Sequence, residues 1–331
     1  MGFKVTITPS NIEFNAESAN TILEEALNAK INFPHGCKNG ACAACKCKII
    51  SGEIILDEYN RSALTDAELQ DGYTLLCKSH AQSDLTIDLP GFVNGFPIRT
   101  LPAKIESIEK IGTVAVLKLR LPANQQFSFY AGQYIDIMHK GKNRSYSLAN
   151  SPTESGIVEL HIRYRAGGAF SEAVWSELKE GQILRFTGPL GGFTLKDTDK
   201  KIMMVCTGTG FAPIKSILEY MVATNNRRSV ELIWGNYTDA DFYHTELLSE
   251  WKEKLDLNVK LCINEGVHTD YYTGLVTDYI VANYPDLSAY ELYACGNVAM
   301  IENLYLVARS ELNLGKTDFF SDAFTPSPDS I

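Results

Sequence analysis

The stretch Gly36-Cys37-Lys38-Asn39-Gly40-Ala41-Cys42-Ala43-Ala44-Cys45 (residues 36–45) spaces three cysteines as C-x4-C-x2-C, and Cys77 follows near the end of the same segment. Thiolates at this spacing hold plant-type [2Fe-2S] clusters. A zinc site favours two C-x2-C-like pairs instead. Small residues between the cysteines let backbone N–H groups turn toward a cluster and stabilise its negative charge. The sequence therefore predicts a [2Fe-2S] cluster whose metal ligands are Cys37, Cys42, Cys45 and Cys77.

The composition limits the classes of protein. The chain has 331 residues, of which 45% are hydrophobic, and this is enough for two or three domains. Its net charge is -10 and it has no basic run, so nucleic acid is disfavoured as a partner. No stretch approaches the about 18 unbroken apolar residues of a membrane helix, and we expect neither a signal peptide nor a membrane partner. Because cluster thiolates need reducing conditions, we expect a cytoplasmic location.

The first segment, residues 1–90, is predicted to be a small α+β unit. Its N-terminal residues alternate like a strand. Thr21 and Glu24 form a T-x-x-E capping box that predicts a helix from Thr21 onward. Ser51-Gly52 lies between two strand-like runs and predicts a tight hairpin. The pattern is that of a β-grasp [2Fe-2S] ferredoxin domain.

Two further segments follow a turn-rich linker at residues 91–101. Residues 102–196 contain several short strands with glycines between them and one helix, which favours an antiparallel β-barrel. In residues 197–331 strands alternate with helices, which implies a doubly wound parallel sheet. The predicted fold class is therefore multidomain, with α+β and α/β parts.

Two motifs in the barrel segment suit the diphosphate of a dinucleotide. Residues 144–147 (RSYS) close a strand and offer a cation, an aromatic face and a hydroxyl group. Residues 167–171 (GGAFS) open a helix with glycines, and helix N-termini bind anions. Taken singly, Arg144 also suits a surface charge and Ser171 an N-cap.

A glycine-rich turn follows the first strand of the α/β segment. In Thr207-Gly208-Thr209-Gly210-Phe211-Ala212-Pro213, two glycines permit a tight turn and the close approach of a nucleotide. Pro213 stands where the dinucleotide fingerprint has its third glycine. A plain strand-to-helix turn therefore stays an alternative.

These motifs, with Cys295-Gly296-Asn297, occur in the order found in the ferredoxin-NADP reductase superfamily, which the chain resembles over essentially its whole length. Within it, the chain is similar to the iron–sulfur flavoprotein reductases that feed oxygenases and deoxysugar dehydrases. Residues 131–134, 294–297 and 319–324 are most similar to those of CDP-6-deoxy-hexulose dehydrase reductases. The resemblance implies an NADH-dependent oxidoreductase that passes electrons through FAD and a [2Fe-2S] cluster to a partner enzyme.

The resemblance also implies roles for individual residues. Arg144 binds the FAD diphosphate, Tyr146 packs on the flavin and Ser147 lies near flavin N5. Cys295 lies beside the nicotinamide, and Phe319, in preference to Phe320, covers the flavin, with core packing as the alternative for both aromatic residues. The other implied binding residues are His161, Ile162 and Arg163 along the flavin, mostly through backbone, Gly168 and Ser171 at the diphosphate, and Gly208, Thr209 and Gly210 at the nicotinamide dinucleotide.

The electron chemistry and the choice of nucleotide follow from this set. Nicotinamide gives up two electrons as hydride whereas a [2Fe-2S] cluster takes one at a time, so a flavin must divide the pair. A 2′-phosphate needs arginine, whereas free ribose hydroxyls favour a carboxylate. Asp239 and Asp241 after the second strand therefore favour NADH, and Arg227 and Arg228 just before that strand oppose it.

The sequence leaves the electron acceptor open. The preferred acceptor is a pyridoxamine-dependent deoxysugar dehydrase, and the alternative is an aromatic-ring or multicomponent oxygenase. A redox sensor without flavin is disfavoured because the flavin and nicotinamide motifs are complete. A subunit of a membrane quinone reductase is disfavoured because we expect no N-terminal anchor.

Overall fold

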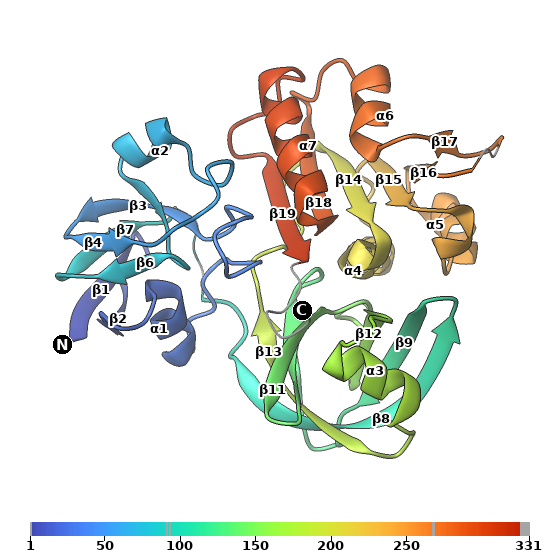
Figure 1. The fold of residues 1–331 in the computed structure, drawn as a ribbon, viewed down its shortest axis with the longest axis horizontal. Coiled ribbons are helices and arrows are strands. Elements are labelled where there is room, and N and C mark those ends of the chain that lie inside the picture. The colour runs from blue at the N-terminus through green and yellow to red at the C-terminus, as the bar shows by residue number, and fades with distance from the viewer. Residues whose placement is uncertain (1, 91, 93, 267–268, 325–331) are drawn as a thin grey trace. The chain divides into compact units, whose positions relative to one another are not determined.

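The computed structural model describes residues 2–90, 92, 94–266 and 269–324 (Figure 1). The chain forms two compact units. The first contains Met1–Ile98, Pro189–Phe193 and Ser321–Ala323, and the second contains Arg99–Gly188, Thr194–Phe320 and Phe324–Ile331. The predicted barrel and α/β segments thus lie almost entirely in the second unit. Residues 91 and 93 of the predicted linker lie outside the described residues.

The first unit is built on a mixed five-stranded sheet in the order β2-β1-β7-β3-β5. Strand β1 pairs in parallel with β7 and antiparallel with β2, while β3 pairs antiparallel with β7 and β5. Its elements are β1 (Gly2–Thr8), β2 (Ile12–Glu17), α1 (Ile22–Asn28), β3 (Lys46–Ser51), β4 (Ile54–Leu56), α2 (Asp66–Gln70), β5 (Tyr73–Leu75), β6 (Ser79–Ala81) and β7 (Leu85–Asp88).

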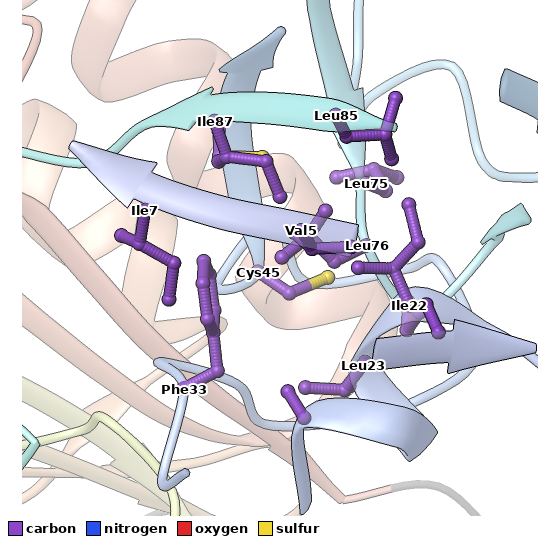
Figure 2. Close-up of a cluster of buried hydrophobic side chains, with 14 of the residues drawn as sticks. Val5, Ile7, Ile22, Leu23, Phe33, Cys45, Leu75, Leu76, Leu85 and Ile87 are labelled. Carbon is purple, nitrogen blue, oxygen red and sulfur yellow. The ribbon is translucent and has the colours of Figure 1, made fainter. Parts of the chain in front are cut away.

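The predicted capping box at the start of α1 is confirmed. The Thr21 hydroxyl accepts from Glu24 N at 3.2 Å, and the Glu24 carboxylate accepts from Thr21 N at 2.8 Å. Two otherwise unpaired helix donors are satisfied in this way, which typically contributes about 1 kcal/mol. The helix turns Ile22 and Leu23 into a buried core that also contains Val5, Phe33 and Ile87 (Figure 2).

The predicted hairpin at Ser51-Gly52 is wrong. Gly52 makes a turn with φ +100°, but the strand after it, β4, pairs with β6 and not with β3. Strand β3 already has β7 on one side and β5 on the other, so both of its edges are occupied. A glycine turn therefore marks a change of direction here without pairing the strands that it joins.

The middle segment forms a six-stranded sheet in the order β11-β10-β13-β8-β9-β12. The pairings of β10 with β11, of β13 with β8, and of β9 with β8 and β12 are antiparallel. A further antiparallel bridge joins Leu148, just after β11, to Leu160 in β12. Apolar side chains such as Leu117, Ile135 and Leu160 form its core. Its elements are β8 (Arg99–Ile111), β9 (Val114–Arg120), β10 (Tyr134–His139), β11 (Lys142–Ser147), β12 (Ile157–Arg163), α3 (Ala169–Ser176) and β13 (Ile183–Leu190).

The last segment alternates strands and helices around a six-stranded sheet in the order β17-β16-β15-β14-β18-β19. The pairings of β14 with β15 and β18, and of β16 with β15 and β17, are parallel, so the carboxyl ends of these strands meet at one edge. The elements are β14 (Lys201–Thr207), a 3-10 turn (Gly208–Gly210), α4 (Phe211–Ala223), β15 (Val230–Asn236), a second 3-10 turn (Asp239–Asp241), α5 (Glu246–Lys254), β16 (Leu257–Ile263), β17 (Tyr272–Thr273), α6 (Val276–Asn283), β18 (Tyr290–Asn297), α7 (Val298–Ser310) and β19 (Phe319–Phe324).

Candidate functional site

The predicted cluster loop lies between α1 and β3. Lys38, Gly40 and Ala43 have positive φ angles of 59°, 84° and 57°, and these turns direct backbone N–H groups toward sulfur. Ala41 N donates to Cys37 Sγ, and Cys37 N donates to Cys42 Sγ, both at 3.3 Å. The backbone of the loop therefore stabilises negative charge on the sulfur atoms of Cys37 and Cys42.

The four predicted cysteine ligands form two hydrogen-bonded pairs, Cys37 with Cys42 and Cys45 with Cys77. A hydrogen bond from the Cys42 thiol lowers the pKa of Cys37 to about 6, and a hydrogen bond from the Cys45 thiol lowers the pKa of Cys77. In the part of the chain that the structure describes, no three His, Cys, Asp or Glu side chains converge as a single metal ion would require. Two pairs of thiols fit a group with two irons, in which each iron takes two thiolates.

The two diphosphate motifs of the middle segment come together through aromatic packing. Tyr146 at the end of β11 packs on Phe170 of α3 with ring centroids 5.4 Å apart, and burial raises the pKa of Tyr146 to about 12. Ser147 is buried, and Arg144 is half-buried on the same side of the strand as Tyr146. A guanidinium, an aromatic ring and a buried hydroxyl therefore lie within the last four residues of one strand.

The turn before α3 needs its glycine and its serine. A Cβ at Gly168 would lie 2.5 Å from Ser171 Oγ and 3.1 Å from the carbonyl oxygen of Arg165. The Ser171 hydroxyl donates to the carbonyl oxygens of Arg165 and Gly168 at 3.1 and 3.0 Å. Ser171 therefore stabilises the turn through its side chain. At the same helix end, the Glu172 carboxylate accepts a hydrogen bond from Gly167 N at 2.8 Å.

Strand β12 divides its side chains between two environments. Ile162 belongs to the core of the middle segment, whereas His161 and Arg163 point to the opposite face, toward the last segment. Arg163 donates to Asn236 Oδ1 at 3.4 Å and lies 3.8 Å from Asp241 Oδ1. The side chains of His161 and Arg163 therefore point toward the last segment. The predicted flavin contact of this stretch would then be made by its backbone.

The glycine turn after β14 is held from two sides. Gly208 has φ +56°, and its carbonyl oxygen accepts from the indole nitrogen of Trp234 at 3.1 Å. Trp234 in turn stacks on Phe211, with ring centroids 4.0 Å apart and an interplanar angle of 7°. On the other side, a Cβ at Gly210 would collide with the carbonyl oxygen of Cys295. Only glycine at position 210 lets the ends of β14 and β18 approach this closely.

A pocket of about 490 Å³ opens at the carboxyl edge of the last sheet. Among the predicted binding residues, Arg163, Gly208 and Thr209 line it. Lining residues to which the sequence analysis assigned no individual role include Arg165, Thr207, Asn236, Tyr237, Asn297 and Phe324.

Several predicted residues do not line the pocket. Cys295 is fully buried at the end of β18, and Asp239 lies in an exposed 3-10 turn. Phe319 packs against Tyr305 at 5.0 Å, and Phe320 stacks on Tyr293 at 4.9 Å. The aromatic residue of β19 that reaches the pocket is Phe324. The only sequence signal for it was its place in the same C-terminal run of aromatic residues.

A buried cluster of charged side chains connects β12 to α4. Lys215 Nζ lies 3.0 Å from Glu159 Oε1 and 2.6 Å from Glu219 Oε1. His161 hydrogen-bonds to Glu159 at 3.0 Å and to the Tyr243 hydroxyl at 3.0 Å. Burial lowers the pKa of His161 to about 4, so the imidazole is neutral at pH 7. The pKa of Glu219 is raised, because the effect of burial exceeds the opposite effect of Lys215. These contacts hold the helix that follows the glycine turn against the strand that carries Arg163.

Comparisons with known domains cover most of the chain. Residues 5–82 match the 2Fe-2S iron-sulfur cluster binding domain, residues 102–195 the oxidoreductase FAD-binding domain and residues 204–305 the oxidoreductase NAD-binding domain. In the part of the chain that the structure describes, no helix has the length and hydropathy of a membrane span.

Several relatives match the chain over nearly its whole length. The CDP-6-deoxy-L-threo-D-glycero-4-hexulose-3-dehydrase reductase of Yersinia pestis is 38% identical over 99% of this chain and 100% of its own length. The reductase component of propane 2-monooxygenase from Mycolicibacterium smegmatis is 33% identical over 97% of both chains. The crystal structure of the Amycolatopsis cytochrome P450 reductase GcoB superposes with a TM-score of 0.78 and 26% identity over 98% of this chain and 99% of its own.

Proposed function

Because the chain belongs to the iron–sulfur flavoprotein reductases of the ferredoxin-NADP reductase superfamily, we propose that its electron acceptor is a CDP-6-deoxy-hexulose 3-dehydrase of deoxysugar biosynthesis. The chain is an NAD(P)H-dependent oxidoreductase with FAD-binding and [2Fe-2S]-binding domains. The observation that supports this acceptor is the 38% identity with a dehydrase reductase over the whole length of both chains.

When bound, NADH would supply hydride, FAD would divide the electron pair and the [2Fe-2S] cluster would carry single electrons. The protein has to bind and orient these groups. Cys37 and Cys42 would hold one iron, and Cys45 and Cys77 the other. This pairing is supported by the two thiol pairs and by N–H groups directed at sulfur.

On the middle segment, we place the flavin against Tyr146 and the hydroxyl of Ser147, with Arg144 at the diphosphate and Gly168 at the helix end. The contact between Tyr146 and Phe170 supports this, because it brings both motifs to one place. We also propose the finer fold assignments: a β-grasp first unit, a closed antiparallel barrel and a doubly wound nucleotide sheet. The Leu148–Leu160 bridge and the parallel pairings of β14, β15 and β16 support them.

On the last segment, we place the nicotinamide dinucleotide in the 490 Å³ pocket. Among the described residues, Arg163 Nε and Asn236 Nδ2 are buried donors that have no acceptor. Buried donors are almost always satisfied, so these two fit a ligand rich in phosphate and carbonyl oxygens. Gly208 and Thr209 border the same space. We place Cys295 beside the nicotinamide, where its neighbour Gly296 lines the pocket. Phe319 stays the proposed cover of the flavin, and Phe324, also in β19, lines the same pocket.

An oxygenase component is the second candidate acceptor, and the 33% identity with a propane 2-monooxygenase reductase favours it. The test mixes the purified protein and NADH with each acceptor in turn. We expect sugar deoxygenation by the dehydrase to depend on the reductase, while hydroxylation by a monooxygenase component does not increase. Increased hydroxylation without deoxygenation would contradict the proposed acceptor. The need for reduced thiols supports a cytoplasmic location for this activity.

A further inference from the structure

Trp234 connects the buried core of the last segment to the glycine turn at the pocket. It lies near the carboxyl end of β15, beside Cys206 of β14, and its side chain is fully buried. Its indole nitrogen donates a hydrogen bond to the carbonyl oxygen of Gly208 at 3.1 Å. Gly208 is the first residue of the 3-10 turn and lines the pocket. A buried side chain that does not line the pocket therefore contacts the backbone that does.

Three aromatic rings fix the position of the indole. Phe211 stacks on it with ring centroids 4.0 Å apart and an interplanar angle of 7°. Phe242 and Tyr243 make T-shaped contacts with it, with ring centroids 4.9 and 5.5 Å away. A ring packed against three neighbours in a dense core has little freedom to tilt. The direction of its N–H bond is therefore set by the core and not by the pocket.

The bond from Trp234 orients the peptide group between Gly208 and Thr209. The carbonyl oxygen of Gly208 accepts from Phe211 N as well as from the indole, so two donors hold it inside the protein. In a trans peptide the C=O and N–H bonds point in opposite directions. The N–H bond of Thr209 is therefore directed away from the indole. Thr209, like Gly208, lines the pocket.

This orientation needs support because the residue that carries it is glycine. Gly208 has φ +56°, a conformation that glycine adopts without strain and also leaves without strain. A Cβ at Gly208 would lie 3.5 Å from the guanidinium of Arg163, whose Nε is a buried donor without an acceptor. The turn and this guanidinium therefore border the same part of the pocket, and N–H groups gathered in this way suit the oxygens of an anion.

We propose that Trp234 is a positioning residue for the diphosphate of the nicotinamide dinucleotide: its indole N–H holds the peptide after Gly208 so that the Thr209 N–H points at the diphosphate. The inference rests on the proposed placement of the dinucleotide in this pocket and adds a residue that acts on it without touching it. A donor that is fixed before the ligand arrives loses no freedom when the ligand binds. Without the indole N–H, the glycine peptide could rotate and direct its own N–H elsewhere.

The first test compares Trp234→Phe, which keeps an aromatic ring but removes the N–H, with the wild-type holoenzyme. In calorimetric titrations, the Kd for ADP-ribose should rise about three- to tenfold, as expected for one lost hydrogen bond. ADP-ribose contains the diphosphate and lacks the nicotinamide, so it reports on this end of the pocket alone. With ferricyanide as acceptor, KM for NADH should rise by a similar factor while kcat stays within about twofold, because the change affects binding and not hydride transfer.

Trp251→Phe is the matched control. Trp251 is also buried and its ring centroid lies 6.1 Å from that of Phe211, but it comes from α5 and not from the strand beside the glycine turn. Both variants should unfold at lower urea concentrations than wild type, as circular dichroism measures. Only Trp234→Phe should change the affinity for ADP-ribose; Trp251→Phe should keep Kd and KM within about twofold of wild type. Loss of stability is thereby separated from loss of binding.

A second variant separates the hydrogen bond from the size of the ring. Benzothienylalanine at position 234 keeps the bicyclic ring and has sulfur in place of the N–H group, and it should weaken ADP-ribose binding as much as Trp234→Phe does. The inference is overturned if this variant binds ADP-ribose within about twofold of wild type, or if Trp251→Phe weakens binding as much as Trp234→Phe. A wild-type holoenzyme that binds no ADP-ribose and oxidises no NADH would overturn the placement of the dinucleotide itself, a result that is seen before any variant is compared.

Discussion

Replacing Lys215 by methionine tests the buried charge cluster that joins the strand carrying Arg163 to the helix after the glycine turn. The side chains of Lys215 and Glu159 are only 7% and 6% exposed, so the substitution leaves a buried carboxylate without its closest cation. Breaking a buried pair in this way typically costs about 3–5 kcal/mol. Lys118 Nζ remains 3.4 Å from Glu159, and Glu219 is 21% exposed and retains some hydration. We therefore expect a loss of about 3 kcal/mol in the free energy of unfolding.

Tryptophan fluorescence during urea unfolding measures this loss selectively, because Trp175, Trp234 and Trp251 all lie in the second unit. The double variant E159Q/K215M removes the charge on both sides and should recover to within about 1 kcal/mol of wild type. K118M, which breaks only the more exposed contact with Glu159, should cost less than about 1 kcal/mol. A K215M protein as stable as wild type, or a double variant no more stable than the single one, would refute the reasoning.

Three further predictions concern the histidine, the cofactors and the glycine turn. The pKa of His161 is lowered from 6.5 to about 4, so between these pH values the unfolded chain binds a proton that the folded protein does not bind. The free energy of unfolding should therefore fall by about 3 kcal/mol between pH 6.5 and 4. If urea titrations of H161Q gave the same dependence of stability on pH as wild type, this expectation would be contradicted. Tyr146→Ala should weaken FAD binding about tenfold through the lost ring contact, which equilibrium dialysis measures and an unaltered Kd would disprove. Gly210→Ala should lower the free energy of unfolding by about 1–3 kcal/mol and weaken NADH binding, because the new Cβ would collide with the Cys295 carbonyl oxygen. Normal NADH affinity in a fully folded variant would show that NADH binding does not need the close approach of Gly210 to Cys295.

Local sequence signals predicted several elements because the signals act over short distances. The Thr21–Glu24 box marked α1 correctly, and the same pattern at Thr65 and Glu68 caps α2, which was missed. The five residues of α2 include no buried side chain, so hydrophobic periodicity, the signal that usually supports a helix, was absent. A capping pattern alone was sufficient evidence of a helix start here.

Long-range contacts could not be read from the sequence. Glu159, His161 and Arg163 alternate along β12, but nothing in this alternation points to Lys215, the partner of Glu159, which lies on a helix 56 residues further along the chain. The common position of Tyr237 and Asn264 in the pocket wall likewise depends on the parallel pairing of β15 with β16. The cysteine spacing was sufficient to predict the [2Fe-2S] cluster binding domain because three of the proposed ligands share one loop, whereas the proposed fourth, Cys77, is distant in the sequence.

The most direct test of the electron path is an anaerobic titration of the purified holoprotein with NADH, followed by absorption and electron paramagnetic resonance spectroscopy of wild type and Cys42→Ser. We predict that NADH bleaches the flavin band in both proteins and that only wild type shows the paramagnetic signal of a reduced [2Fe-2S] cluster and transfers electrons to an added dehydrase. A wild-type protein whose flavin is bleached by NADH while its cluster stays oxidised would contradict the path from nucleotide through flavin to iron.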